Sequence, residues 1–393
     1  MVRILSQREQ PIELSPHPLL SQPSLLRASS ILYHIHFIVM APRVLVFGTG
    51  AIGAVAAYIL SRSIPAENIV TVCRSNYEVA SQDGFRLNST IWGKDLVFRP
   101  KVVRSVEEAA ALEASKPFDY ILVSTKILPS ETPTAQALKP AISNSTAIVL
   151  MQNGIVIEGD YAQLYPDNPL LSVVVYLPVT QVKPAIFEHV HLELLHVGTY
   201  PAQAPSSHKT AARSFVQLIE QGGATVQLHD DVQPERWSKL LINGTLNPIC
   251  ALSRSRTALF LRSGDAAPAL FRDVMNEIAS VAQALGYTSV NQESVDYQYK
   301  RHMSYEPPGV EPSTMADALA GRRMEVDALV GNIVKLANEK SVTVPILRTL
   351  YVLLTALDNS LSPDGANSQR GPDHSPESIR AYIKNAPQST IST

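Results

Sequence analysis

Short apolar runs rich in Val, Ile and Leu alternate with helical stretches from residue 42 to about residue 200. This alternation is typical of a mostly parallel sheet wrapped by helices. The runs predict strands at residues 44–47, 69–73, 120–124, 147–150 and 172–177. Residues 85–98 and 186–197 have an antiparallel character, and we expect them at the edge of this sheet.

After Pro205 the pattern changes, because long amphipathic stretches replace the short runs. Only residues 225–229 still predict a strand. Helices are predicted at residues 211–221, 234–251, 265–285, 313–320, 323–340 and 345–358. The predicted fold class is α/β, with a mostly parallel sheet domain at residues 42–208 and an all-helical C-terminal domain at residues 209–358.

The two ends of the chain differ from the rest in composition. Residues 1–41 are rich in Ser, Pro and Leu, and we expect a disordered extension whose most apolar run is too short to span a bilayer. Basic residues leave a signal peptide or a mitochondrial transit peptide as an alternative, although two glutamates depart from the acid-poor composition of a transit peptide. A simpler interpretation starts the protein at Met40. Residues 359–393 predict a largely disordered tail with a short helix near residues 376–384.

The overall composition narrows the class of partner. A length of 393 residues suits two domains, and the net charge of −2, with both signs scattered, gives no electrostatic footprint for nucleic acid or for a membrane surface. We therefore expect a small-molecule partner. Cys73 and Cys250 have no spacing typical of disulfides or metal sites, so we expect a reducing compartment, the cytoplasm, and no metal.

A glycine motif marks a nucleotide site. Gly48, Gly50 and Gly53 form GxGxxG between an apolar strand and an Ala-rich helix, the fingerprint of a Rossmann-type dinucleotide-binding domain. The three glycines allow the tight turn, the approach of a pyrophosphate and close helix–sheet packing. Ala51 and Ile52 open the helix, whose amides and dipole attract the anion, so we expect them at the cofactor as well.

The end of the second strand predicts which nucleotide binds. NAD-specific sites place an acid there to bind the ribose 2′-hydroxyl, but this chain has Arg74, whose guanidinium suits a 2′-phosphate. NADPH is therefore the expected cofactor. Lys126 and Asn153 end two further strands and should face the same crevice, where they would touch cofactor or substrate, although Asn153 precedes a glycine and could be a turn residue.

A polar stripe follows in the helical domain. Lys239, Asn243 and Asn247 are spaced four residues apart, so on one helix they would form a stripe among apolar neighbours. Asparagine is a poor helix former, which favours a stripe that lines a cleft over a solvated face. Further on, Ser313 is placed as a helix N-cap, and Glu325 supplies a carboxylate that could equally be surface charge.

These motifs, in this order, resemble the ketopantoate reductase family (2-dehydropantoate 2-reductases). The resemblance runs from residue 43 to about residue 354, through GTGAIG, the strand ends at Lys126 and Asn153, the WSKLLINGTLNP block and the PSTMAD segment with Glu325. It implies that Lys239 is the general acid and that Asn243 and Asn247 bind the substrate. Ser313 would contact the substrate carboxylate, and Glu325 the substrate hydroxyl or Lys239. Arg74, Lys126 and Asn153 would serve NADPH.

One segment departs from the family pattern and leaves the substrate open. Residues 175–191 lack the small, glycine-rich run that family members usually have where the substrate meets the sheet. Ketopantoate, reduced to pantoate for pantothenate biosynthesis, is the first candidate, and another keto acid or ketone of specialised metabolism is the alternative. A non-enzymatic NADP sensor would not need the polar stripe. A homodimer through the helical domain is compatible with the sequence.

Overall fold

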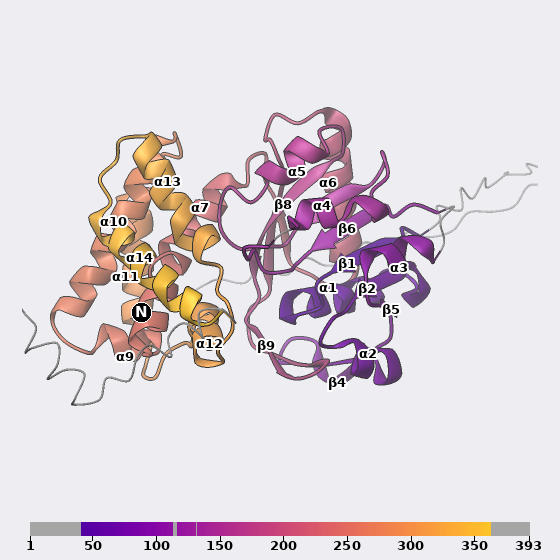
Figure 1. Ribbon diagram of the computed structural model, residues 1–393, viewed down its shortest axis with the longest axis horizontal. Coiled ribbons are helices and arrows are strands. Elements are labelled where there is room, and N and C mark those ends of the chain that lie inside the picture. Colours follow the sequence, from indigo (N-terminus) through magenta and orange to yellow (C-terminus); the bar gives the residue numbers. More distant parts are fainter. Residues whose placement is uncertain (1–40, 113–115, 131, 363–393) are drawn as a thin grey trace, which may run out of the picture. The chain divides into compact units, whose positions relative to one another are not determined.

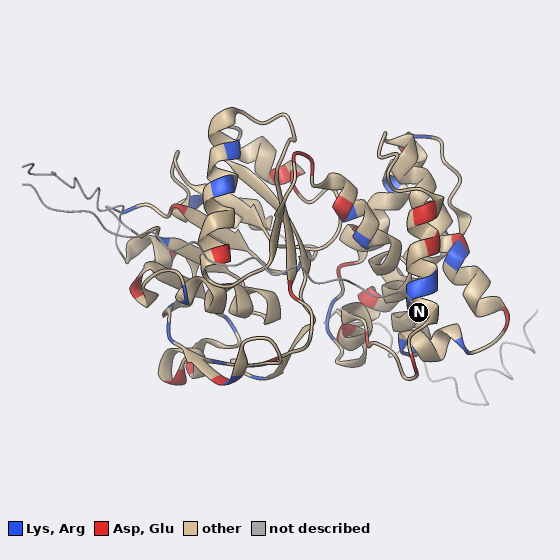
Figure 2. Ribbon diagram, turned by 180° about the vertical axis from the view of Figure 1, so that it is seen from behind, with Lys and Arg blue, Asp and Glu red and all other residues tan. Residues whose placement is uncertain are grey.

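The computed structural model describes residues 41–112, 116–130 and 132–362 (Figure 1). The predicted N-terminal extension, except residue 41, and the predicted tail from residue 363, with its short helix, lie outside these residues. Of the tail, residues 359 and 360 still belong to a helix, Pro345–Ser360. Within them, no helix is long and apolar enough to cross a membrane. Lysine and arginine are interspersed with acidic residues over both domains (Figure 2).

The first part of the chain forms an eight-stranded sheet in the order β12-β11-β8-β7-β6-β1-β2-β5. All neighbouring strands are parallel except β8 and β11. The mostly parallel sheet is therefore confirmed. Its strands are β1 (Val44–Phe47), β2 (Ile69–Val72), β5 (Lys101–Val103), β6 (Tyr120–Val123), β7 (Ala147–Leu150), β8 (Leu170–Tyr176), β11 (Leu194–Thr199) and β12 (Val226–Leu228).

Helices cover both faces of this sheet because successive strand residues point to opposite sides. Val44 and Val46 pack with helices α1 (Ala51–Ser61) and α6 (Ser206–Gln221), whereas Leu45 lies in a separate cluster. That cluster contains residues of α3 (Val106–Ala111), α4 (Thr134–Ala137) and α5 (Gly159–Leu164). Helix α6 packs on the sheet and β12 is one of its strands, so the sheet domain continues beyond residue 208, where the sequence placed its end.

A second, four-stranded sheet has the order β4-β3-β10-β9. It consists of β3 (Phe85–Ser89), β4 (Gly93–Phe98), β9 (Val179–Lys183) and β10 (Ile186–His189). The expectation that residues 85–98 and 186–197 decorate the edge of the main sheet was wrong for β3, β4 and β10. Strand β11 does join the main sheet, antiparallel to β8, but it lies next to the edge strand β12 and not at the edge itself. Alternation of apolar residues predicts a strand, but it does not say which strand becomes its partner.

The helical domain has its own apolar core, drawn from all of its long helices. The helices are α7 (Gln233–Asn243), α8 (Leu246–Ser253), α9 (Thr257–Leu261), α10 (Ala266–Ala284), α11 (Gln292–Met303), α12 (Ser313–Leu319), α13 (Asn332–Glu339) and α14 (Pro345–Ser360), with a π-helical segment at Asp327–Gly331 before α13. The Rossmann-like domain followed by a helical domain is thus confirmed, although α9 and α11 were not predicted.

The helix expected at residues 234–251 is two helices, and that prediction is corrected. Asn243 ends α7, Gly244 and Thr245 interrupt it, and α8 begins at Leu246. Pro248 explains the break: it has no N–H, so it fits the first turn of α8 but not the interior of one long helix. A Cβ at Gly244 would lie 2.9 Å from the side chain of Ile278, so glycine also lets α7 pack closely on α10.

Candidate active site

The glycine motif forms a tight strand-to-helix turn with space at its centre. Gly48 has φ +96°, and Gly53 packs so close that a Cβ there would lie 1.9 Å from the Gly48 carbonyl oxygen. By contrast, a Cβ at Gly50, the N-cap of α1, would meet no atom within 4 Å. Ala51 and Ile52 begin α1, where the first N–H groups have no partner inside the helix. This geometry fits a dinucleotide pyrophosphate.

Arg74 follows β2 beside this turn. The neighbouring Cys73 thiol lies 2.8 Å from the Thr49 hydroxyl, and Asn76 Nδ2 donates to the Thr49 carbonyl at 2.7 Å, so the residues after β2 lie against the glycine turn. The Arg74 side chain is exposed, and its guanidinium forms no hydrogen bond or ion pair with another described residue. It is therefore available to an anion bound at the turn.

Lys126 lies at the end of β6 and contacts the helical domain. Its Nζ atom lies 2.5 Å from Oδ2 of Asp317 on α12, and Asp317 also accepts a hydrogen bond of 3.0 Å from Arg322. The backbone N–H of the next residue, Ile127, donates to Oε1 of Glu325 at 3.0 Å. Sequence reasoning missed Asp317 as the partner of Lys126, although it stands within the PSTMAD segment; the expectation that Lys126 serves the cofactor stays a prediction.

Lys239 on α7 reaches the sheet domain. Its Nζ atom donates to Asn153 Oδ1 at 2.7 Å and to the Val175 carbonyl oxygen at 2.5 Å, and it lies 5.3 Å from the centre of the Tyr176 ring. Burial, together with the nearby charge of Arg236, lowers the pKa of Lys239 to about 7, while the charge of Glu325 opposes the shift. A lysine with such a pKa can donate and regain a proton near neutral pH.

Arg236, one turn before Lys239, lies in the most buried polar network of this region. It pairs with Glu158 at 3.1 Å, and the two side chains are only 2% and 1% exposed. Arg236 also donates to the Ser172 hydroxyl and to the carbonyls of Gln152 and Gly154. These contacts fix α7 on the ends of β7 and β8. Sequence reasoning missed this arginine, although a cation directly before the Trp-Ser-Lys motif was a visible signal.

Glu325 is half-buried, and burial raises its pKa, while the Ile127 N–H and the charge of Lys126 favour the ionised form. The charges of Asp317 and Lys239 also act on it, in opposite directions. Glu325 therefore belongs to the same electrostatic environment as Lys239.

The predicted stripe is only partly formed. Lys239 and Asn243 lie four residues apart on α7, but Asn247 is buried on α8, where its amide donates to the Thr314 hydroxyl at 3.3 Å. Ser313 is exposed and is the first residue of α12, not its N-cap; Pro312 holds the cap position and no side chain caps this helix. The cap prediction is therefore corrected, and Ser313 has a hydroxyl that the helix does not use.

A small cavity lies beside the lysine and has a volume of about 10 Å³, close to the space of one water molecule. Residues of the sheet domain and of α7 share its lining, among them Asn153, Val174, Lys239 and Asn243. The cavity therefore places Lys239 and Asn243 together beside the residues that follow β7.

The fold and this site define a class of protein, a two-domain oxidoreductase with a Rossmann-like nucleotide domain and a helical domain. The model for the ketopantoate reductase PanE/ApbA family matches residues 44–202, and the model for its C-terminal domain matches residues 231–358. The chain belongs to the ketopantoate reductase family.

Curated relatives include both named and functionally undefined proteins. The chain is 29% identical over 363 residues to the meiotically up-regulated gene 72 protein of Schizosaccharomyces pombe, covering 88% of this chain but only 62% of that protein. It is 24% identical over 323 residues to a 2-dehydropantoate 2-reductase of a Nostoc species, covering 80% of this chain and 94% of the reductase.

Solved structures agree with the fold. A 2-dehydropantoate 2-reductase from Methylococcus capsulatus is 30% identical with a TM-score of 0.70 and covers 81% of this chain and 98% of its own. D-mandelate dehydrogenase in a ternary structure with NADH and anilino(oxo)acetate is 19% identical with a TM-score of 0.70 and covers 81% and 99%. A dimeric ketopantoate reductase from Staphylococcus aureus is 23% identical with a TM-score of 0.64 and covers 81% and 100%.

Proposed function

We propose that this protein uses NADPH to reduce a small 2-keto acid to the 2-hydroxy acid, with ketopantoate as the first candidate. The observation that carries the proposal is the environment of Lys239. Its pKa is lowered, and its ammonium is held in place by hydrogen bonds to Asn153, which follows β7, and to the carbonyl oxygen of Val175 near the end of β8. A nucleotide sensor would have no use for such a group.

Lys239 acts in this proposal as the proton donor. An ammonium has three N–H donors, and two are directed to Asn153 and Val175, which leaves one for the keto oxygen. The bound nicotinamide supplies the hydride. As the keto carbon gains the hydride, charge develops on its oxygen, and the ammonium first stabilises that charge and then transfers its proton. The C=O bond becomes C–OH, and the lysine is left neutral.

The remaining polar groups bind and orient the substrate in this proposal. Ser313 offers its unused hydroxyl to the substrate carboxylate, and Asn243 lines the cavity beside Lys239. The negative charge of Glu325 favours the ammonium form of Lys239. The buried amide of Asn247, which donates to Thr314, would act by holding α8 on α12 rather than by direct contact.

The preference for NADPH rests on Arg74. Its free guanidinium stands beside the glycine turn, where a ribose 2′-phosphate would accept two parallel hydrogen bonds. No carboxylate occupies the end of β2, so the feature that favours NADH is missing at this position. Lys126 contacts Asp317 with one of its three N–H donors, which leaves two for the cofactor.

A different keto acid or ketone is the alternative substrate, favoured by residues 175–191, which form the end of β8, β9 and β10 instead of a glycine-rich segment. One assay separates the candidates: NADPH absorbance is followed with ketopantoate, its unbranched analogues and aromatic 2-keto acids. A kcat/KM for ketopantoate well above the others supports the first candidate. No NADPH oxidation with any 2-keto acid would overturn the proposal.

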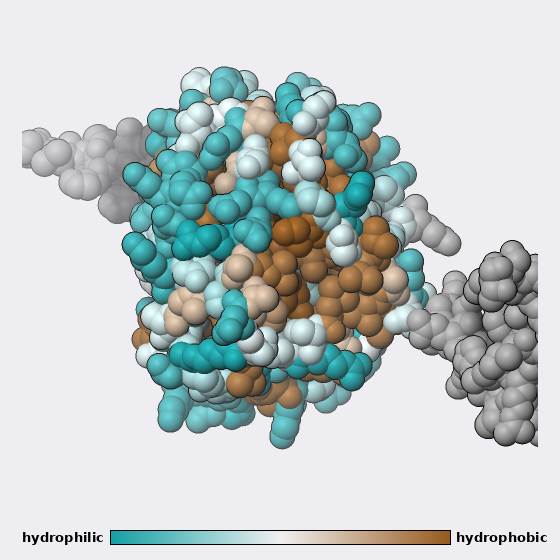
Figure 3. Space-filling view, turned by 90° about the vertical axis from the view of Figure 1, so that its left-hand side faces the viewer, coloured by the Kyte–Doolittle hydropathy of each residue, from teal (hydrophilic) through white to brown (hydrophobic). Residues whose placement is uncertain are grey.

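The proposal extends to a homodimer formed through the helical domain. Apolar side chains gather on the face shown in Figure 3. Separately, α14 exposes the apolar side chains of Val352 and Leu353 to 60% and 50%. Exposed apolar area of this kind is typical of a subunit interface. Light scattering should give twice the chain mass, and Leu353→Glu should give monomers; a monomeric wild-type protein would contradict this part.

A further inference from the structure

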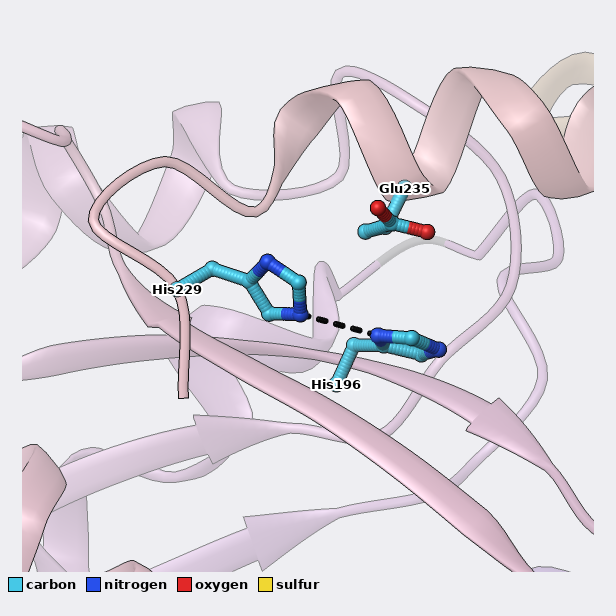
Figure 4. Close-up of side chains that lie close together, drawn as sticks. All are labelled: His196, His229 and Glu235. Carbon is cyan, nitrogen blue, oxygen red and sulfur yellow. Dashed lines mark hydrogen bonds between the residues drawn. The ribbon is translucent and has the colours of Figure 1, made fainter. Parts of the chain in front are cut away.

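Two histidines and a glutamate meet outside the site described above (Figure 4). His196 lies on β11, His229 directly follows β12, and Glu235 lies on α7. The two histidines are brought together because β11 and β12 are paired, and this pairing continues at His229, whose backbone N–H donates to the Val197 carbonyl at 2.8 Å. One ligand atom from each of the three side chains lies within 4.8 Å of the other two.

The two imidazole rings are close enough for a hydrogen bond, and close enough for both to bind one metal ion. His196 Nδ1 and His229 Nε2 are 2.9 Å apart, so one nitrogen donates and the other accepts, and at least one ring is neutral. A neutral imidazole nitrogen is a common metal ligand.

Glu235 adds a negative charge without an evident partner. Its side chain is half-buried and points from α7 toward the two rings, yet its carboxylate forms no hydrogen bond or ion pair with another described residue. Lys239, one turn further along α7, directs its ammonium to Asn153 and Val175 instead. A half-buried carboxylate beside two imidazoles is stabilised when a cation lies between them.

We infer that His196, His229 and Glu235 form a binding site for a divalent transition metal, with Zn²⁺ as the best match. Two imidazoles and a carboxylate are a known zinc ligand set, and bonds of about 2.0–2.2 Å put tetrahedral ligand atoms about 3.3 Å apart. The histidine nitrogens are already near this spacing, and a rotation of the Glu235 side chain closes the rest.

The metal would tie α7 to the sheet. His196 lies on β11 and His229 directly follows β12, whereas Glu235 lies on α7, one turn before Lys239. Tyr176 connects the two sites, because its ring lies 5.7 Å from that of His196 and 5.3 Å from Lys239 Nζ. Metal binding should therefore raise the stability of the folded chain whatever reaction the protein performs.

The test uses the full chain without a histidine tag, stripped of metal with a chelator. Calorimetric titration with ZnCl₂ should show one bound ion per chain with micromolar or tighter affinity, and the melting temperature should rise with Zn²⁺ but not with Mg²⁺. Glu235→Gln and His196→Asn should each weaken binding by at least about 100-fold, more than the loss of an outer-shell partner causes.

His208→Asn, on α6 and outside the cluster, is the matched control and should bind Zn²⁺ as the wild type does. Melting curves without metal show whether each variant folds, and Glu235→Gln keeps the size of the side chain. Absence of zinc binding in the wild type, or unchanged binding in both cluster variants, would overturn the inference.

Discussion

Lys239 Nζ donates a 2.7 Å hydrogen bond to Asn153 Oδ1, although the two residues are 86 positions apart. The lysine belongs to the helical domain and the asparagine to the end of β7 in the sheet domain. The contact therefore places the proposed proton donor at the carboxyl ends of the strands, where parallel α/β proteins bind their ligands. It also makes Asn153 a residue that orients the ammonium, in addition to its predicted place at the cofactor.

The cofactor preference can be tested at Arg74. Arg74→Ala should raise the KM for NADPH by about tenfold or more, as expected when a charged hydrogen bond is lost. The KM for NADH should hardly change, because NADH has no 2′-phosphate. Initial rates with both cofactors check this. Equal losses with NADPH and NADH would show that Arg74 does not recognise the phosphate.

Ser313 tests substrate binding. Ser313→Ala should raise the KM for the keto acid more than the KM for NADPH, and the melting temperature should stay unchanged because the hydroxyl caps no helix. Ser206 is the matched control, since it also begins a helix after a proline cap, and Ser206→Ala should alter neither constant. A loss of stability without a change in KM would assign Ser313 a structural role only.

The buried pair of Arg236 and Glu158 should dominate local stability. Arg236→Met leaves Glu158 without its cation in a buried place, and we expect a loss of about 3–5 kcal/mol in the free energy of unfolding. Arg86 is the control: its pair with Asp95 is exposed, so Arg86→Met should cost about 1 kcal/mol or less. Urea unfolding measures both, and similar losses would contradict the importance of the buried pair.

The sheet was predictable where strands are short, apolar and buried on both faces. Val44–Phe47 and Ala147–Leu150 have the expected bounds, and the glycine motif stands between strand and helix as expected. The second sheet was not predictable, because apolar alternation does not name the partner strand. Helix α11 was missed since its sequence is polar, although Asn291, which accepts from the N–H groups of Glu293 and Ser294, is a typical cap signal.

The site was predictable where its residues share one motif and less so where the fold joins distant ones. Lys239 and Asn243 share α7, but Pro248 divides the expected helix and sends Asn247 to α8. No spacing rule connects Lys126 with Asp317, because their contact depends on how α12 meets the end of β6.

The pH dependence of the reaction follows from the lowered pKa of Lys239. Lysine donates a proton only when charged, so the active form is present below its pKa of about 7 and is lost as the pH rises through that value. The kcat/KM for keto acid reduction should therefore fall about tenfold per pH unit above the pKa. A kcat/KM that stays constant from about pH 6 to about pH 9 would show that no group of this pKa donates the proton.

The central claim, that Lys239 protonates the forming alkoxide, is tested most directly by the kcat of Lys239→Ala with NADPH and the best keto acid. The account predicts a fall of about 10²–10⁴-fold, with a smaller change in NADPH affinity and no high-pH limb in the remaining activity. Melting curves should show that the variant is folded. A positioned general acid contributes at least about 100-fold to kcat. If Lys239→Ala keeps more than about a tenth of the wild-type kcat, the loss is too small for the removal of a general acid, so another residue donates the proton and the assignment of Lys239 is wrong.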